Sequence, residues 1–169
     1  MKCLLVCAAL VFAWTAPVAA APQQLLGRSV IVSMNTYTPA QADDGTPSAA
    51  RSITLTFYIS SQGRAFVRAD HVGSSAGRPS ARGEVGPESR TAHFSGNQLV
   101  ASAKFGSGAS QLIVAFDPSY RTCTANVLVG SEAGKSFTYI GFNGKRYTAT
   151  GKTVVSNVTC AVRDGNALG

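Results

Sequence analysis

The chain is 169 residues long and carries a formal net charge of +7 at pH 7. That length suits one domain of ordinary size with its own hydrophobic core, and it argues against a multidomain protein. Only 8 acidic residues and 2 histidines are present, so the groups that general acid–base catalysis needs are scarce.

The first twenty residues have the parts of a secretory signal peptide. Lys2 supplies the positive start, an apolar run follows, and Val18-Ala19-Ala20 fits a small-residue cleavage site. The apolar run is too short to cross a bilayer, and no later stretch is long enough for a transmembrane helix. A lipoprotein signal ending at Cys7 is the alternative, but it would leave almost no apolar segment before the cysteine. We therefore expect residues 1–20 to be removed and residues 21–169 to act in the periplasm or as a secreted protein.

Alternation of apolar and polar residues recurs along the remaining chain and predicts antiparallel strands, whereas apolar residues at helical spacing are nearly absent. A first strand is expected around Val32 and the clearest one over residues 51–60. The side chains expected to face inward from the second strand are Ile53, Leu55, Phe57 and Ile59. Residues 38–50 are interpreted as a loop, and a further strand is predicted over residues 64–70.

Residues 71–87 differ in kind, because they are rich in Gly and Pro and contain few apolar residues. They predict a long loop, and loops of this length are usually functional or disordered. Alternation resumes at Phe94 and continues through two strands joined by a turn at residues 106–108. The side chains expected to face inward there are Leu99, Ala101, Ala103, Phe105, Leu112, Val114 and Phe116.

The stretch from Cys123 to Cys160 is a series of short strands separated by turns. Asn143-Gly144 suits a type I′ hairpin turn, and we expect a meander onto which the rest of the sheet is built. Signal cleavage leaves Cys123 and Cys160 as the two remaining cysteines, and both share a strand face with apolar residues. One core disulfide is therefore predicted, and closing so long a loop stabilises the fold by roughly 3–4 kcal/mol. Two free thiols or a metal pair are the alternatives.

Together these patterns predict an all-β domain, built as an antiparallel, meander-rich β-barrel or β-sandwich of about 8–10 short strands. The domain is expected to contain one disulfide and to follow a signal peptide. Tight sequential turns favour the barrel slightly over the sandwich. The polar tail over residues 163–169 is expected to fray.

One motif suggests an enzyme. Residues 73–77 match the Gly-x-Ser-x-Gly nucleophile elbow with Ser75 at its centre, and His93 and Asp117 would nominally complete a triad. The elbow works at a strand–turn–helix bend above a parallel sheet, whereas a Gly-, Pro- and Arg-rich stretch follows here. A secreted serine hydrolase using Ser75 is therefore only an alternative, and no catalytic residue is predicted.

No metal or cofactor site is predicted. Two cysteines with the distant His71 and His93 are too few ligands for zinc, and Asp43-Asp44-Gly45 lacks the alternating oxygen ligands of a calcium loop. Residues 130–136 resemble a phosphate loop, but they are one residue short of the Walker spacing. They would also join two strands, whereas a phosphate loop joins a strand to a helix. The carboxylates of Glu84 and Glu88 are interpreted as solvated.

Basic residues gather between residues 64 and 93. Arginine binds phosphate or carboxylate at two points, whereas lysine acts as a point charge. The candidate anion-binding residues are Arg64, Arg68, Arg78, Arg82 and Arg90. The alternative is that these arginines only protect exposed strand edges and loops from unwanted pairing.

The run over residues 56–64 and the tail over residues 163–166 resemble small exported β-proteins of Gram-negative, alphaproteobacterial type. That resemblance implies export but no characterised site. We expect a non-enzymatic exported domain whose basic loop binds an anionic polysaccharide, lipopolysaccharide or an acidic protein, and not nucleic acid. A small barrel that carries a lipid or another ligand is a further alternative, which a hollow interior would favour.

Overall fold

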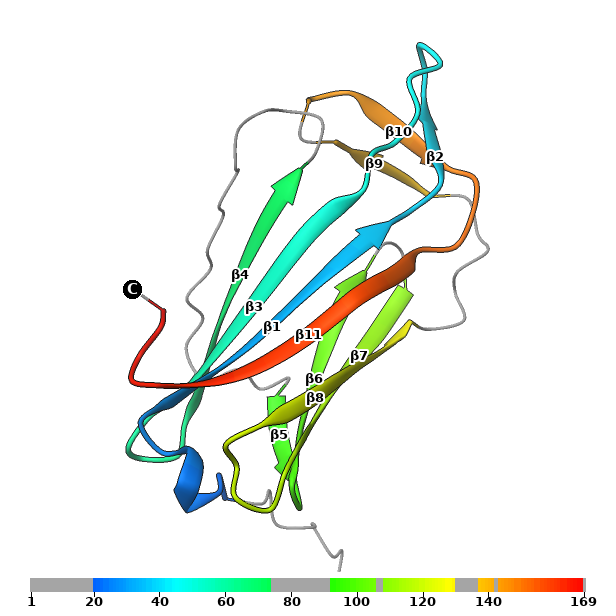
Figure 1. Cartoon of the computed structure of the whole chain (residues 1–169). Coiled ribbons are helices and arrows are strands. Elements are labelled where there is room, and N and C mark those ends of the chain that lie inside the picture. The colour runs from blue at the N-terminus through cyan, green and yellow to red at the C-terminus, as the bar shows by residue number, and fades with distance from the viewer. Residues whose placement is uncertain (1–19, 74–91, 106–107, 130–136, 142, 169) are drawn as a thin grey trace, which may run out of the picture.

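The computed structural model describes residues 20–73, 92–105, 108–129, 137–141 and 143–168, without the side chains of residues 71–73, 103–105, 108 and 109. Apart from one 3-10 turn, η1 (Gln23–Leu25), the described elements are antiparallel strands in three sheets (Figure 1). The strands are β1 (Arg28–Tyr37), β2 (Ala40–Ala42), β3 (Arg51–Ile59), β4 (Ala65–Gly73), β5 (Ala92–Ser95), β6 (Gln98–Phe105), β7 (Gly108–Phe116), β8 (Cys123–Val129), β9 (Thr138–Ile140), β10 (Arg146–Ala149) and β11 (Val154–Asp164). The all-β prediction is thus confirmed, and the described residues form eleven strands where about eight to ten were expected.

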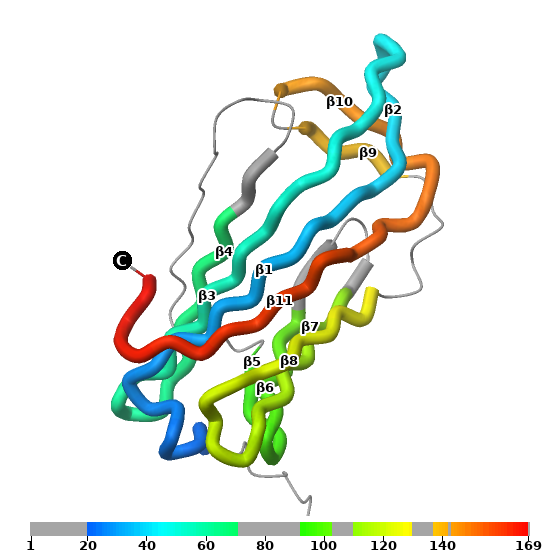
Figure 2. The backbone as a smooth tube through the Cα atoms, in the orientation of Figure 1, coloured from blue at the N-terminus to red at the C-terminus, as the bar shows by residue number. Residues whose placement is uncertain are grey.

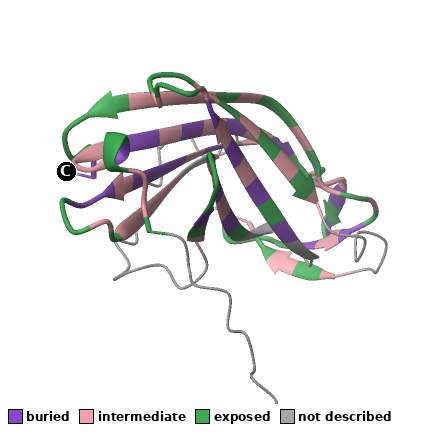
Figure 3. Ribbon diagram, turned by 90° about the horizontal axis from the view of Figure 1, so that it is seen from below, coloured by how far each residue is buried: buried purple, intermediate pink, exposed green. Residues whose placement is uncertain are grey.

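Two four-stranded sheets pack face to face and enclose one core. Their strand orders are β11-β1-β3-β4 and β5-β6-β7-β8, so the architecture is a sandwich rather than a closed barrel. Buried residues alternate with more exposed ones along much of the strands, as Figure 3 shows and as a half-buried strand requires, although in β3 the outward-facing Thr56 is buried as well. The inward-facing side chains predicted for β3 are all buried. Those predicted on β6 and β7 are buried too, except that the side chains of Ala103 and Phe105 lie outside the described residues.

The described interior is filled with side chains. The largest fully buried ones are Phe57, Leu25, Ile59, Leu99 and Leu112. They come from both sheets and from η1, and they belong to a single cluster. The described core thus resembles the close-packed interior of a stable domain and does not show the hollow that a ligand carrier would need.

A third sheet, which we call the mini-sheet, lies at one end of the sandwich and consists of β2, β10 and β9 in that order (Figures 1 and 2). It has a small core of its own in which Tyr147 is buried with alanines of β2 and β10. Residues 40–42 were expected to be loop, but they pair with β10 through Tyr147↔Ala42 and Ala149↔Ala40. We call this end the mini-sheet end and the other the opposite end.

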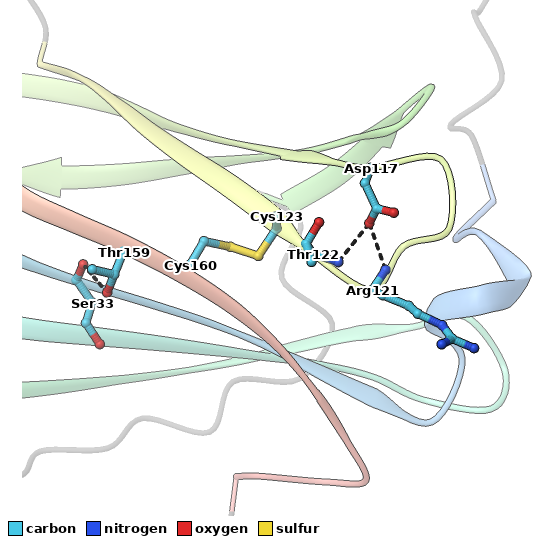
Figure 4. The surroundings of a disulfide bond; sticks show 7 residues. All are labelled: Ser33, Asp117, Arg121, Thr122, Cys123, Thr159 and Cys160. Atoms are coloured by element: carbon cyan, nitrogen blue, oxygen red, sulfur yellow. Dashed lines mark hydrogen bonds between the residues drawn. A yellow bond between two sulfur atoms is a disulfide. The ribbon is translucent and has the colours of Figure 1, made fainter.

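The expected meander between Cys123 and Cys160 is wrong, although the disulfide is confirmed. β8 pairs with β7, β10 pairs with β2 and β9, and β11 pairs with β1. The disulfide therefore joins the edge strands of two different sheets, with Cα atoms 5.6 Å apart (Figure 4). Alternation fixes which face of a strand is buried but not which strand becomes its neighbour.

The hairpin predicted at Asn143-Gly144 is present, but its turn differs from type I′. Gly144 N donates to Gly141 O, Gly141 N donates to Lys145 O, and Gly144 has φ 77°. This is the three-residue loop in which one residue takes the left-handed conformation, and glycine does so at no steric cost. The loop between β3 and β4 has the same pattern, with Gly63 at φ 77°.

The C-terminal tail is held on the sheet, so the expected fraying is wrong. Ser29 Oγ donates to Gly165 O over 2.7 Å and accepts from Ala167 N over 2.9 Å. Arg68 Nη1 donates to Leu168 O over 2.7 Å, and the Leu168 side chain is buried. The tail therefore turns from β11 toward β4 and covers the outer face of the sheet at the opposite end (Figure 2).

The predicted loop over residues 71–87 begins later than expected, because β4 continues to Gly73. Its last three residues pair with the start of β3, ending with Arg51↔Gly73. The remainder of that loop and the predicted signal peptide up to residue 19 lie outside the described residues.

Candidate functional site

The loop between β7 and β8, at the opposite end, is organised around the Asp117 carboxylate. Its Oδ1 accepts from Arg121 N and Thr122 N over 2.8 and 2.7 Å, and its Oδ2 accepts from the amide and hydroxyl of Ser119 (Figure 4 shows the first two). The Ser119 hydroxyl and the Thr122 amide hold the pKa of Asp117 well below its usual range. Asp117 is thus a structural cap for this loop.

Arg28 links the two sheets at the same end. Its Nε donates to Asp164 Oδ1 over 2.7 Å, and its Nη1 donates to Tyr120 O over 3.1 Å. The Tyr120 ring packs on Phe116 with ring centroids 5.5 Å apart. Asp117 and Tyr120 of this loop therefore stabilise the fold.

Among the described residues, the two other members of the nominal serine triad, His93 and Asp117, are not bonded to each other. Asp117 is held by its own loop, His93 is exposed on β5, and Ser75 lies outside the described residues. A triad needs the acid bonded to the imidazole and the imidazole bonded to the nucleophile. The described residues give the hydrolase alternative no support.

The mini-sheet end is built around stacked aromatic rings. Tyr139 and Tyr147 are cross-strand partners whose ring centroids lie 5.5 Å apart at an interplanar angle of 16°. The Arg51 guanidinium of β3 lies 5.0 Å from the centroid of Tyr139, and Asn143 Nδ2 donates to Tyr147 Oη over 2.9 Å. A cation–π contact of this kind contributes roughly 0.5–1 kcal/mol and ties the mini-sheet to the sandwich.

A shallow hollow of about 220 Å³ lies beside these rings and is lined by Ala42, Asp43, Asp44, Lys145 and Arg146. Lys145 Nζ donates to Asp44 Oδ2 over 2.6 Å and to Thr46 Oγ1 over 2.8 Å. The Lys145 hydrogen bond lowers the pKa of Asp44, and Asp44 in turn raises the pKa of Lys145. Both groups are therefore charged at any physiological pH.

The exposed large hydrophobic side chains of the described chain all lie toward the mini-sheet end. They are Tyr37, Leu128, Ile140 and Val154. Ile140 is 63% exposed and is the cross-strand partner of Arg146, whereas Tyr37 pairs with Val154. Single exposed hydrophobic residues are ordinary, but their restriction to one end distinguishes that end from the other.

Two of the five predicted anion-binding arginines, Arg64 and Arg68, lie within the described residues. Arg64 lies in the β3–β4 turn at the opposite end, separated from Gly73 by the length of β4, roughly 30 Å at about 3.3 Å per residue. Arg68 donates to Asp70 over 2.9 Å as well as to Leu168, so it is a structural tether rather than an open anion site. Arg78, Arg82 and Arg90 lie outside the described residues, as do Glu84, Glu88 and residues 130–136.

Sequence reasoning missed Lys145 and Arg146. Their signal was an adjacent basic pair directly after the Asn143-Gly144 turn, where a hairpin loop places side chains in solvent. It also missed Arg51, whose position at the start of a strand gives no hint of a tyrosine 88 residues further along. Only the pairing of β9 with β10 brings that ring into place.

Comparisons with protein-family models, curated proteins and solved structures found no match. Among the described residues, no three His, Cys, Asp or Glu side chains come together as a metal site requires. Within the same residues, no helix has the length and apolar character needed to cross a membrane. The account of function therefore rests on the geometry of the mini-sheet end.

Proposed function

We propose that this protein is an exported, non-enzymatic β-sandwich that binds an anionic partner outside the cytoplasm through its mini-sheet end. The observation that carries the proposal is the difference between the two ends. Exposed apolar side chains and the hollow lined by Lys145 and Arg146 lie at the mini-sheet end. At the opposite end the charged groups are used by the fold, because Arg28 bonds to Asp164 and to Tyr120 O, and Asp117 bonds to backbone amides of its own loop. Exposed apolar groups beside fixed charges are typical of interaction surfaces.

The basic segment, residues 74–91, follows directly after Gly73, the last residue of β4. Gly73 is the cross-strand partner of Arg51, so the segment leaves the sandwich beside the residue that contacts Tyr139. It carries Arg78, Arg82 and Arg90. These three arginines supply forked donors for carboxylate, sulfate or phosphate.

Export is supported by the signal-like N-terminus and by the disulfide, since structural disulfides persist in oxidising compartments. The partners available there are acidic polysaccharides, the phosphates of lipopolysaccharide and acidic protein faces. Their shared property is negative charge, so the proposal predicts binding that weakens as salt rises.

The test is retention of the mature protein on immobilised lipopolysaccharide and on an acidic polysaccharide across a sodium chloride series. We expect retention at low salt, and its loss in the variant Arg78→Gln, Arg82→Gln, Arg90→Gln with thermal stability unchanged. The matched control removes three charges at the opposite end, through Arg64→Gln, Arg121→Gln and Arg163→Gln, and should bind like the parent. Equal retention of both triple variants, or retention indifferent to salt, would refute the proposal.

A further inference from the structure

We propose that the hollow between the β2–β3 turn and the β9–β10 turn is a subsite for one carboxylate-bearing sugar unit of an acidic polysaccharide. This inference rests on the proposed function and specifies its partner. It assigns Lys145 and Arg146 to the carboxylate and Asp43 to a sugar hydroxyl.

Lys145 presents a donor in a fixed direction. An ammonium group has three N–H donors, and the contacts with Asp44 and Thr46 use two of them. The third remains for a ligand. Because the side chain is already immobilised by those bonds, binding costs less conformational entropy than it would for a freely rotating lysine.

Arg146 supplies the second contact. It follows Lys145 in the chain and lines the same hollow, and its guanidinium makes no hydrogen bond or ion pair with the described residues. The planar fork of arginine matches a carboxylate at two points. Two neighbouring cations with different geometries favour a planar anion over a spherical one.

The charges of the hollow favour a sugar unit over a bilayer surface. Lys145 and Arg146 are balanced by Asp43 and Asp44, so the hollow as a whole is not a strongly positive patch of the kind that anionic lipid attracts. Asp44 is neutralised by Lys145, whereas Asp43 makes no hydrogen bond with the described residues and is left to accept from a hydroxyl. An acidic sugar offers both an anion and hydroxyl donors.

Size and surroundings point to one unit of a longer chain. A volume of about 220 Å³ is below the roughly 300–1,000 Å³ of pockets that enclose a drug-sized ligand. The cross-strand partner of Arg146 is the exposed Ile140, which provides apolar contact for the C–H face of a sugar ring.

The test is titration calorimetry of the mature protein with oligogalacturonate at low salt, with the fully methyl-esterified oligomer as the neutral counterpart. We expect Arg146→Gln and Lys145→Gln each to weaken binding of the acidic oligomer at least tenfold. The ester should not bind. Lys152→Gln, which removes a cation at the same end but outside the hollow, should change affinity less than twofold. Arg146 is exposed, so its variant should keep the parent's melting temperature.

The inference is overturned if Arg146→Gln binds the acidic oligomer like the parent, or if the ester binds equally well. It is also overturned if phosphatidylglycerol vesicles are bound and oligogalacturonate is not. If the hollow variants bind normally while the triple variant of the basic segment does not, the subsite is wrong and the proposed function stands. If the parent binds no anionic probe, both fail.

Discussion

Cys123 and Cys160 join β8 and β11, the edge strands of two sheets that otherwise meet through side chains. The disulfide lies on the side of the sandwich where these two strands face each other. A covalent link at this position holds one long edge of the sandwich closed, and it constrains the unfolded chain as well.

The double variant Cys123→Ser, Cys160→Ser should lose about 2–4 kcal/mol of unfolding free energy. The loss arises from greater chain entropy in the unfolded state and from weaker contact between β8 and β11. Guanidinium unfolding followed by tyrosine fluorescence measures it. A midpoint equal to that of the parent would show that the disulfide does not stabilise the sandwich.

Ser29→Ala should release the C-terminal tail. The hydroxyl of the fully buried Ser29 donates to Gly165 O and accepts from Ala167 N. Its removal leaves both backbone groups without that partner, at a cost of about 1–3 kcal/mol of unfolding free energy. Hydrogen exchange at the Ala167 amide should accelerate. Ser33→Ala removes a hydroxyl from the same face of the same strand and should leave that amide protected. Unchanged exchange in the Ser29 variant would contradict the tail account.

Asp117 should make stability sensitive to acid. Its pKa is lower in the folded protein than in the unfolded chain, so its contribution is present above about pH 4 and is lost as pH falls toward the folded value. The parent should therefore lose melting temperature between pH 5 and pH 2 more steeply than Asp117→Asn does. Asp43→Asn controls for the loss of one acidic group and should follow the parent. Parallel pH profiles for the parent and Asp117→Asn would refute this role.

Gly141→Ala should disturb the aromatic stack of the mini-sheet. A Cβ at this position would lie 2.7 Å from Tyr147 Cε2 and 2.9 Å from Asn143 Oδ1, so the ring must move. We expect a loss of about 1–3 kcal/mol and a changed near-ultraviolet circular dichroism signal from tyrosine. Tyr147→Phe keeps the ring and deletes only the hydroxyl, so its effect should be smaller. A spectrum for Gly141→Ala identical to the parent's would contradict the close packing.

Local patterns were sufficient to predict the strands other than β2, and the buried faces of the main ones. Period-two alternation identified Ile53, Leu55, Phe57 and Ile59 as core residues because each strand faces water on one side only. The disulfide followed from the two cysteines that remain after signal cleavage, each on the apolar face of its own strand. Nothing in that alternation distinguishes one neighbouring strand from another, so the expected meander was wrong.

The missed features depend on contacts between residues far apart in the chain. Arg68 was interpreted as an open cation because no local signal reveals that Leu168 O accepts its hydrogen bond. The tail was expected to fray because it is polar, and its one large apolar residue, Leu168, is too little for a periodic pattern. β2 was missed because three residues between Pro39 and a turn become a strand only when β10 lies beside them. The hollow at Lys145 was missed for the same reason, because its lining residues come from two turns that are far apart in the chain.

The most direct test of the account is a map of where an anionic ligand binds. Nitrogen-15-labelled mature protein is titrated with oligogalacturonate, and amide chemical shifts are followed by nuclear magnetic resonance. The account predicts that the largest changes occur at Asp43–Thr46, in β9 and β10, and at the start of the basic segment after Gly73. The loop over residues 117–122 and the β3–β4 turn should stay unperturbed. Changes concentrated in that loop and that turn, or no changes anywhere, would contradict the assignment of binding to the mini-sheet end.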